Sequence, residues 1–114
     1  MKKINIVKEN EVFSNIINKG PYVKDKNLVI YYMPNNLNRA RFGISVGTKV
    51  GKAHIRNNLK RKLRNIVDIN KNSYSNSKDY IIIVRKACLE ASFEDIKNSY
   101  DNLLLKIYKK EKEK

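Results

Sequence analysis

The stretch RFGISVGTKVGKAHIRNNLKRKLRN, residues 41–65, contains the two patterns that decide the fold. In the first pattern, apolar residues occupy every second position from Ala40 to Val46, which predicts a strand with one face in the core. The opposite face has little bulk at Gly43 and Ser45, so either a packed helix or a sugar-phosphate backbone could lie close against it. A glycine-containing turn then leads into the second pattern.

The second pattern predicts a helix after Gly51, over KAHIRNNLKRKLRNIV, residues 52–67, which has no internal Gly or Pro. At about 100° per residue, the apolar side chains from Ile55 to Ile66 fall on one narrow stripe that can pack on a sheet. The polar residues form a contiguous face directed mostly away from that stripe. This face comprises Arg56, Asn57, Lys60, Arg61 and Arg64.

The basic face of this helix predicts a polyanionic partner. No Asp or Glu occurs between Thr48 and Val67, whereas ordinary solvated helix faces mix both signs of charge. Like charges four residues apart destabilise the free helix by a few tenths of a kcal/mol per pair, and a bound phosphate backbone would reverse that sign. The chain as a whole has 25 Lys and Arg against 11 Asp and Glu, a net charge of +14. Nucleic acid is therefore the leading partner.

An anionic membrane is the rival partner for such a charge. No apolar run approaches the roughly 20 residues needed to span a bilayer. The N-terminus also lacks the hydrophobic segment and cleavage site of a secretory signal. A single cysteine, Cys88, suits a reducing compartment and is expected to pack in the core. These features favour a cytoplasmic protein.

The remaining elements follow from apolar spacing and from turn residues. Ser92, with Asp95 three residues later, predicts a capping box at the start of the last helix. We expect a first helix that is capped by Asn10 and ends at Gly20 and Pro21, followed by a brief edge strand at Tyr22 and Val23. Two further strands are expected over residues 28–33 and 80–84, with a surface loop over 68–78. The last helix is expected to end in a frayed tail over residues 109–114.

Together the elements predict a single domain, residues 1–114, of the α+β class: a two-layer α/β sandwich. The chain is too short for two stable cores, and no repeat or composition shift divides it. No paired carboxylates, Ser/His/Asp arrangement or metal-ligand group is evident in the sequence. His54 has no nearby partner for acid-base work and is expected to be structural or to bind phosphate.

The motif R-N-x-x-K-R-x-x-R at residues 56–64, after a strand and a glycine-containing turn, resembles the signature of the bacterial ribonuclease P protein family. Phe13 in the first helix, residues 28–31, and KDYIIIVRKA at residues 78–87 extend the resemblance over nearly the whole chain. It implies a mixed sheet of about four strands with three helices and an uncommon left-handed strand-helix-strand crossover.

In function, the resemblance implies a subunit of an endoribonuclease. The protein would join a large catalytic RNA, with one protein copy expected per RNA, and the particle would cut precursor tRNA to release the 5′ leader. The chemistry would be phosphodiester hydrolysis assisted by Mg²⁺ that is held mainly by the RNA. The catalytic groups would lie in the RNA, so no catalytic residue is expected in this chain.

Two residue sets carry the implied contacts. By the resemblance, the basic helix would face the catalytic RNA through Arg56, Asn57, Lys60, Arg61 and Arg64, with Lys52 as a helper. The 5′ leader would lie in a cleft between the first helix and the sheet, against Phe13, Ile17 and Tyr31.

Alternatives stay open for the three leader residues. Phe13 and Ile17 lie on an apolar helical stripe, so ordinary core packing explains them equally well. For Tyr31, burial with a bonded hydroxyl is as good an interpretation as leader contact.

The sequence departs from the family pattern at two positions. Asn58 stands where the family often has Arg, so one phosphate contact would be absent or supplied by Lys62. Ile17 replaces a frequent aromatic residue, so apolar contact would replace stacking there.

Two other functions compete with this interpretation. A structural RNA-binding protein of ribosomal type would share the size, charge and mixed fold but not this motif. A DNA-binding helix-turn-helix module would place a helix before the basic helix, whereas here a strand precedes it.

Overall fold

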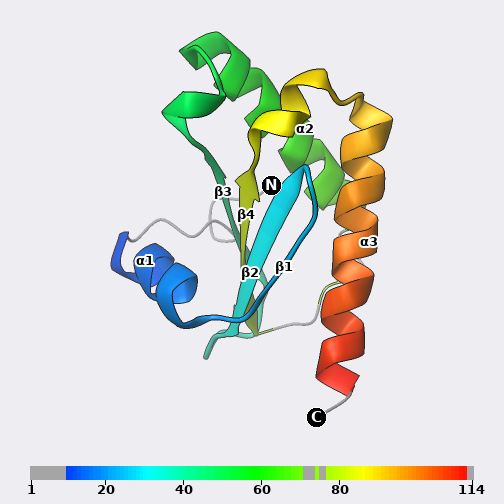
Figure 1. The fold of residues 1–114 in the computed structure, drawn as a ribbon. Coiled ribbons are helices and arrows are strands. Elements are labelled where there is room, and N and C mark those ends of the chain that lie inside the picture. The colour runs from blue at the N-terminus through cyan, green and yellow to red at the C-terminus, as the bar shows by residue number, and fades with distance from the viewer. Residues whose placement is uncertain (1–9, 71–73, 75–76, 113–114) are drawn as a thin grey trace.

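The computed structural model describes residues 10–70, 74 and 77–112 of the chain. Within these ranges, three α-helices pack around a four-stranded sheet (Figure 1). In chain order the elements are α1 (Asn10–Lys19), β1 (Tyr22–Lys24), β2 (Leu28–Pro34), β3 (Arg41–Val46), the 3-10 helix η2 (Thr48–Val50), α2 (Ala53–Ile69), β4 (Lys78–Val84), the 3-10 helix η3 (Lys86–Glu90) and α3 (Phe93–Lys112).

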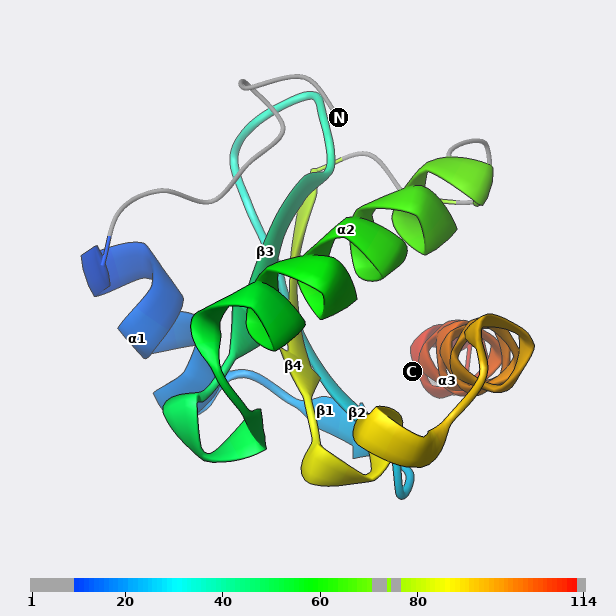
Figure 2. The ribbon, with the colours of Figure 1, turned by 90° about the horizontal axis from the view of Figure 1, so that it is seen from above.

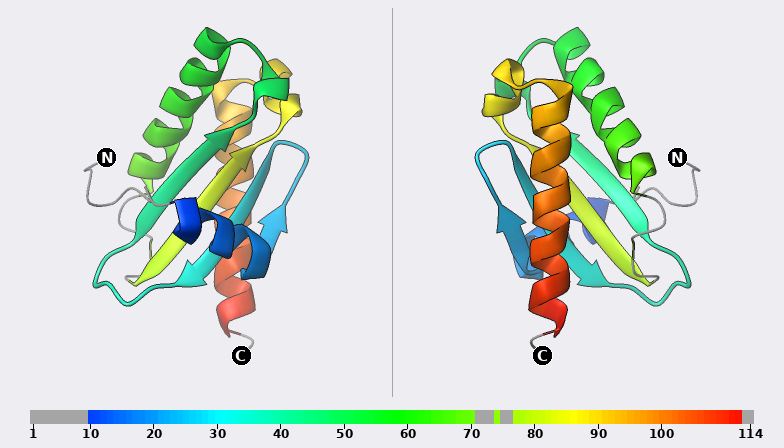
Figure 3. Two further views of the ribbon diagram at one scale, coloured as in Figure 1. Left: turned by 90° about the vertical axis from the view of Figure 1, so that its left-hand side faces the viewer. Right: turned by 90° about the vertical axis from the view of Figure 1, so that its right-hand side faces the viewer.

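The sheet is mixed, with strand order β1-β2-β4-β3. β2 pairs antiparallel with both β1 and β4, whereas β3 and β4 are parallel and are therefore joined by a crossover that contains α2. Seen from the side that carries α2 and α3, β4 lies to the left of β3 while both strands run upward (Figure 3, right). The crossover is thus left-handed, as the resemblance implied and against the general right-handed rule.

The face of the sheet under α2 and α3 holds the main core (Figure 2). Alternate residues of the strands point into it, as the period-two pattern predicted for β3. Phe42 and Val46 of β3, and Tyr80, Ile82 and Val84 of β4, are all buried there. This alternation assigns the intervening residues of each strand to the opposite face.

The opposite face is covered by α1 and holds a smaller apolar cluster. Ile16 of α1 and Ile81 of β4 are its buried members. A Cβ built on Gly43 would lie 2.9 Å from Cδ1 of Ile81 and 3.1 Å from the Phe13 ring. The sequence left open whether a packed helix or a sugar-phosphate backbone lies against this small-residue face. At Gly43 it is a packed helix, because the missing side chain makes room for Phe13 of α1.

Several predicted boundaries shift by a few residues. The sequence assigned residues 68–78 to a loop, but α2 continues through Ile69 and β4 already begins at Lys78. The capping box is confirmed: the Asp95 N–H donates to Ser92 Oγ at 3.1 Å, and the Ser92 N–H donates to Asp95 Oδ2 at 3.3 Å. The structure extends α3 to Lys112, where the sequence predicted fraying from residue 109, and residues 113–114 lie outside the described part.

Cys88 is buried, as expected for a packing residue, with its side chain 2% exposed. Its Sγ–H donates to the carbonyl oxygen of Asn27 at 3.2 Å, which links η3 to the turn before β2. Burial, and then the nearby Asp25 carboxylate, raise the pKa of the thiol to about 11. Within the described ranges, no helix is both long enough and apolar enough to cross a bilayer.

Candidate RNA-binding surfaces

The first candidate surface is the polar face of α2. The helix is held to the sheet by its apolar stripe, in which Leu59, Leu63 and Ile66 are buried. Along the other side, Arg56 and Lys60 are half-buried, whereas Asn57, Arg61 and Arg64 are exposed. Lys52, directly before the first helical residue, is also exposed. We call these six residues, Lys52, Arg56, Asn57, Lys60, Arg61 and Arg64, the α2 basic face.

The cations of the α2 basic face are not neutralised by the acidic residues that the structure describes. Among the residues that the structure describes, no Asp or Glu forms an ion pair with Arg56, Lys60, Arg61 or Arg64. Arg56 is oriented instead by a backbone contact, because its Nε–H donates to the Gly51 carbonyl oxygen at 3.1 Å. The face therefore presents unpaired guanidinium and ammonium groups, which suit phosphate oxygens.

The C-terminal end of α2 is anchored through the segment after it. The Tyr74 hydroxyl lies 3.0 Å from the Val67 carbonyl oxygen and 2.7 Å from the Tyr100 hydroxyl of α3. The Tyr74 ring also meets the Phe42 ring edge-on, with centroids 4.6 Å apart. Burial raises the pKa of both Tyr74 and Tyr100 well above the usual value, because it disfavours the charged phenolate form.

The second candidate surface is the apolar cluster under α1. Phe13 and Ile17 of α1 and Tyr31 of β2 meet there, so the structure brings the three predicted leader residues together. All three are half-buried and form a shared apolar surface with Met33 and Ile83. We call Phe13, Ile16, Ile17, Tyr31, Met33, Ile81 and Ile83 the α1 cluster.

Tyr31 keeps part of its ring at the surface. Its ring centroid lies 5.2 Å from that of Tyr22, its register partner on β1, at a tilted 41° between ring planes. No hydrogen bond joins the Tyr31 hydroxyl to another residue in the described part of the chain, which counts against burial with a bonded hydroxyl. The exposed part of the ring is the kind of surface on which an unpaired base stacks.

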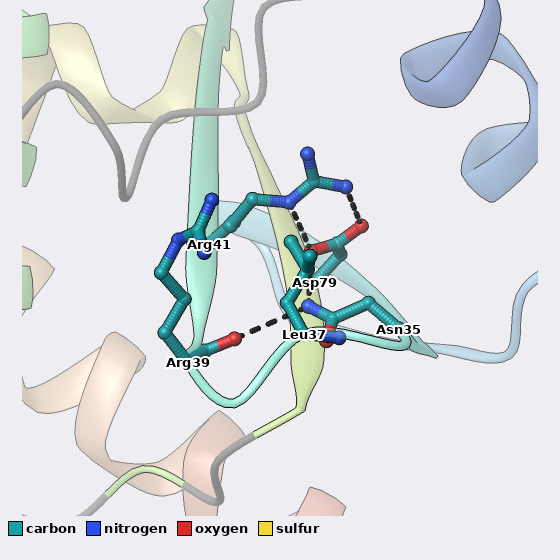
Figure 4. Close-up of polar contacts among 5 residues, drawn as sticks. All are labelled: Asn35, Leu37, Arg39, Arg41 and Asp79. Carbon is teal, nitrogen blue, oxygen red and sulfur yellow. Dashed lines mark hydrogen bonds and ion pairs between the residues drawn. The ribbon is translucent and has the colours of Figure 1, made fainter.

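An ion pair closes the end of the sheet beside the α1 cluster (Figure 4). Arg41 binds Asp79 through two hydrogen bonds, Nε to Oδ1 at 2.9 Å and Nη2 to Oδ2 at 2.7 Å. Asn35 Nδ2 donates to the same carboxylate at 2.7 Å, and Asn35 Oδ1 accepts from the Leu37 N–H at 2.9 Å. This network ties the connection between β2 and β3 to β4, and sequence patterns alone did not reveal it.

Comparison with known proteins then decides the family. A family model described as Ribonuclease P matches residues 1–108. This chain belongs to the ribonuclease P protein family. It is 40% identical over 110 residues to the ribonuclease P protein component of Mycoplasma capricolum, covering 96% of this chain and 97% of that protein. With the component from Bacillus pumilus it shares 37% identity over 107 residues, covering 93% and 90% of the two chains.

The fold agrees with this assignment. The solved structure of the Staphylococcus aureus RNase P protein matches with a TM-score of 0.82 at 34% identity, covering 92% of this chain and 95% of that one. The three helices and the mixed four-stranded sheet are thus those of a ribonuclease P protein. The chain is a protein component of a ribonuclease P, an endoribonuclease assembled with RNA.

The two departures from the family pattern lie at accessible positions. Asn58 is exposed on α2, and Lys62, one turn further on, is half-buried. Ile17 provides an aliphatic contact in the α1 cluster beside Phe13 and Tyr31. His54 is exposed in the first turn of α2, where it adds a polar group near Lys52.

Sequence reasoning missed one further group of cations. Lys106, Lys109 and Lys110 of α3 lie with Tyr22 and Lys24 of β1 around a hollow at the sheet edge. The spacing of the three α3 lysines places them on one side of a helix, which was the available signal. That signal was overlooked because the last residues of the chain were expected to fray.

The described part of the chain also bears on metal binding. In those ranges, no three His, Cys, Asp or Glu side chains come together in a way that could hold a metal ion. The sequence expectation placed Mg²⁺ mainly on the RNA partner.

Proposed function

We propose that this ribonuclease P protein binds the catalytic RNA through the α2 basic face and the 5′ leader of precursor tRNA through the α1 cluster. The observation that carries the proposal is the cationic side of α2, which forms no ion pair among the described residues. On the other face of the sheet, the aromatic rings of Phe13 and Tyr31 are partly exposed. The particle would cut precursor tRNA so that the mature 5′ end remains. This work takes place in the cytoplasm, with one protein copy per RNA.

The α2 basic face supplies phosphate contacts rather than chemistry. Each arginine offers a planar fork for two phosphate oxygens, and Asn57 can donate to a 2′-hydroxyl or a base edge. Lys52 extends the face beyond the helix start. Because the apolar stripe fixes α2 to the main core, these contacts would hold RNA in a defined orientation.

The α1 cluster supplies contacts that do not depend on leader sequence. Phe13 and Tyr31 would stack on unpaired bases, and Ile17 would give apolar contact. Stacking on a ring does not identify the base, which suits a protein that must accept many different leaders.

The catalytic groups are proposed to lie in the RNA. Magnesium bound there would assist attack on the phosphodiester bond. The described residues of this chain contribute binding, orientation and positive charge near that centre. The positive charge offsets repulsion between the RNA and its substrate.

The main test is reconstitution. The purified chain, mixed with the catalytic RNA at low Mg²⁺, should restore cleavage of a precursor tRNA at the mature 5′ end. A chain that binds the RNA without stimulating cleavage would instead be a structural RNA binder, the alternative function.

Variants of the α2 basic face then test the interface. Arg61→Ala and Arg64→Ala should each weaken binding to the catalytic RNA by about tenfold, because each removes a charged hydrogen bond. The slope of log affinity against log salt should also become shallower by about 0.9 for each phosphate that is no longer neutralised. The unfolding free energy should change by under about 0.5 kcal/mol, since both side chains are exposed. Unchanged affinity in both variants would reject this interface.

A further inference from the structure

A second cationic surface lies at the sheet edge formed by β1. There the C-terminal half of α3 passes beside β1 (Figure 3, right), and the two elements enclose an open hollow of about 460 Å³. The hollow is lined by Tyr22, Val23, Lys24, Lys106, Lys109 and Lys110, which we call the α3 lysine hollow. Every lysine among them is exposed. No Asp or Glu of the described residues lines the hollow or forms an ion pair with these lysines.

The α3 lysine hollow is built on ordered elements. Val23 is buried in the main core, which fixes β1 under α3. Lys110 Nζ donates to the Tyr22 carbonyl oxygen at 3.3 Å, so the last turns of α3 are joined to the edge strand. Four lysines on two packed elements thereby line one concave surface.

The hollow is continuous with the α1 cluster through Tyr22. This side chain is 46% exposed, and it lines the hollow while its ring meets the Tyr31 ring at 5.2 Å between centroids. A single-stranded nucleic acid that extends from Tyr31 toward β1 would therefore meet the Tyr22 ring and then a group of lysines. Rings beside a cationic groove are the combination that binds single-stranded nucleic acid without reading sequence.

We propose that the α3 lysine hollow binds the backbone of the single-stranded leader where it leaves the α1 cluster. Leader nucleotides farther from the cleavage site would place their phosphates against Lys106 and Lys109, with Tyr22 under a base. The interaction would depend on leader length and salt but not on leader sequence, because lysine offers point charges to any phosphate. This inference rests on the proposed function of the α1 cluster.

The test measures the affinity of the reconstituted holoenzyme for precursor tRNAs whose leaders lengthen one nucleotide at a time. For the wild-type protein, affinity should rise again once the leader passes the α1 cluster. Lys106→Ala combined with Lys109→Ala should abolish this second rise and weaken long-leader binding by roughly threefold to tenfold. The salt slope for the long leader should become shallower by about 1.4, since two phosphates of a single strand are no longer neutralised.

A matched control removes the same charge elsewhere. Lys26→Ala combined with Lys86→Ala deletes two exposed cations that lie outside the α3 lysine hollow and form no ion pair among the described residues, and it should leave the length dependence unchanged. Equal losses of affinity in both double variants, or full long-leader affinity in the α3 variant, would overturn the inference. If the proposed function of the α1 cluster were wrong, the affinity for precursor tRNAs with short leaders would be the same with and without the protein. That result is distinct from the failure of this inference alone.

Discussion

The two faces of the sheet differ in how completely they are covered. Under α2 and α3, strand residues such as Tyr80 and Ile82 are fully buried. Under α1, Ile16 and Ile81 are buried, but the ring of Tyr31 and the side chain of Ile83 remain half-exposed. Because α2 and α3 cover the first face more completely than α1 covers the second, the first face should contribute more to the stability of the fold. The incomplete coverage of the second leaves apolar and aromatic surface available for a ligand.

Neighbouring isoleucines on β4 give the largest contrast between the faces. Ile82→Ala should lower the unfolding free energy by about 4 kcal/mol, because removal of a buried side chain leaves a cavity in the main core. Ile83→Ala, the same change one residue later, should cost about 1 kcal/mol because its side chain is half-exposed. Chemical denaturation of both variants measures the difference. Equal losses of stability would contradict the distinction between the faces.

Asp79 should be an exception to this difference between the faces, because it lies on the α1 side of the sheet and should nevertheless contribute strongly to stability. Asp79 is 3% exposed and pairs with Arg41 on this face. Asp79→Ala should lower the unfolding free energy by about 3 kcal/mol, since it removes a buried carboxylate that accepts two hydrogen bonds from Arg41 and one from Asn35. Lys97→Ala, which breaks the more exposed pair with Asp101, should have a much smaller effect in the same denaturation experiment. Similar values for the two variants would mean that burial of the pair is unimportant.

A smaller effect should appear in leader binding rather than in stability. Tyr31→Leu removes the ring at the surface of the α1 cluster and should weaken holoenzyme binding to precursor tRNA by about 1 kcal/mol. Tyr31→Phe keeps the ring and should bind normally, because the hydroxyl has no hydrogen-bond partner among the described residues. Substrate lacking a leader serves as the control and should bind both variants alike. Weaker binding by the Phe variant would instead point to a role for the hydroxyl.

The last expected effect, which is confined to high pH, is a loss of stability that arises from the face under α2 and α3. The folded-state pKa of Cys88 is raised from 9.0 to about 11, so the unfolded chain loses this proton first. The contribution of Cys88 to stability is therefore complete below about pH 9 and declines as the pH rises through about 11. Denaturation midpoints of the wild type and Cys88→Ala should converge over this interval. Parallel pH profiles would contradict the assignment.

Local patterns in the sequence were sufficient for the elements and for much of the α2 basic face. The alternation in β3, the apolar stripe of α2 and the Ser92 capping box each depend on residues a few positions apart. Such patterns act through the fixed geometry of one strand or helix, so they can be identified without knowing the fold. Whether the predicted residues touch RNA is a separate matter, and it stays a prediction.

Tertiary structure alone decided which distant segments became neighbours. Asp79 meets Arg41 only because β3 and β4 pair in parallel, and Lys110 reaches Tyr22 only because α3 packs over the β1 edge. The strand order, the left-handed crossover and the α3 lysine hollow have the same origin. They depend on how the apolar faces of separate elements are buried together, and the periodicity of a single element carries no information about its partner.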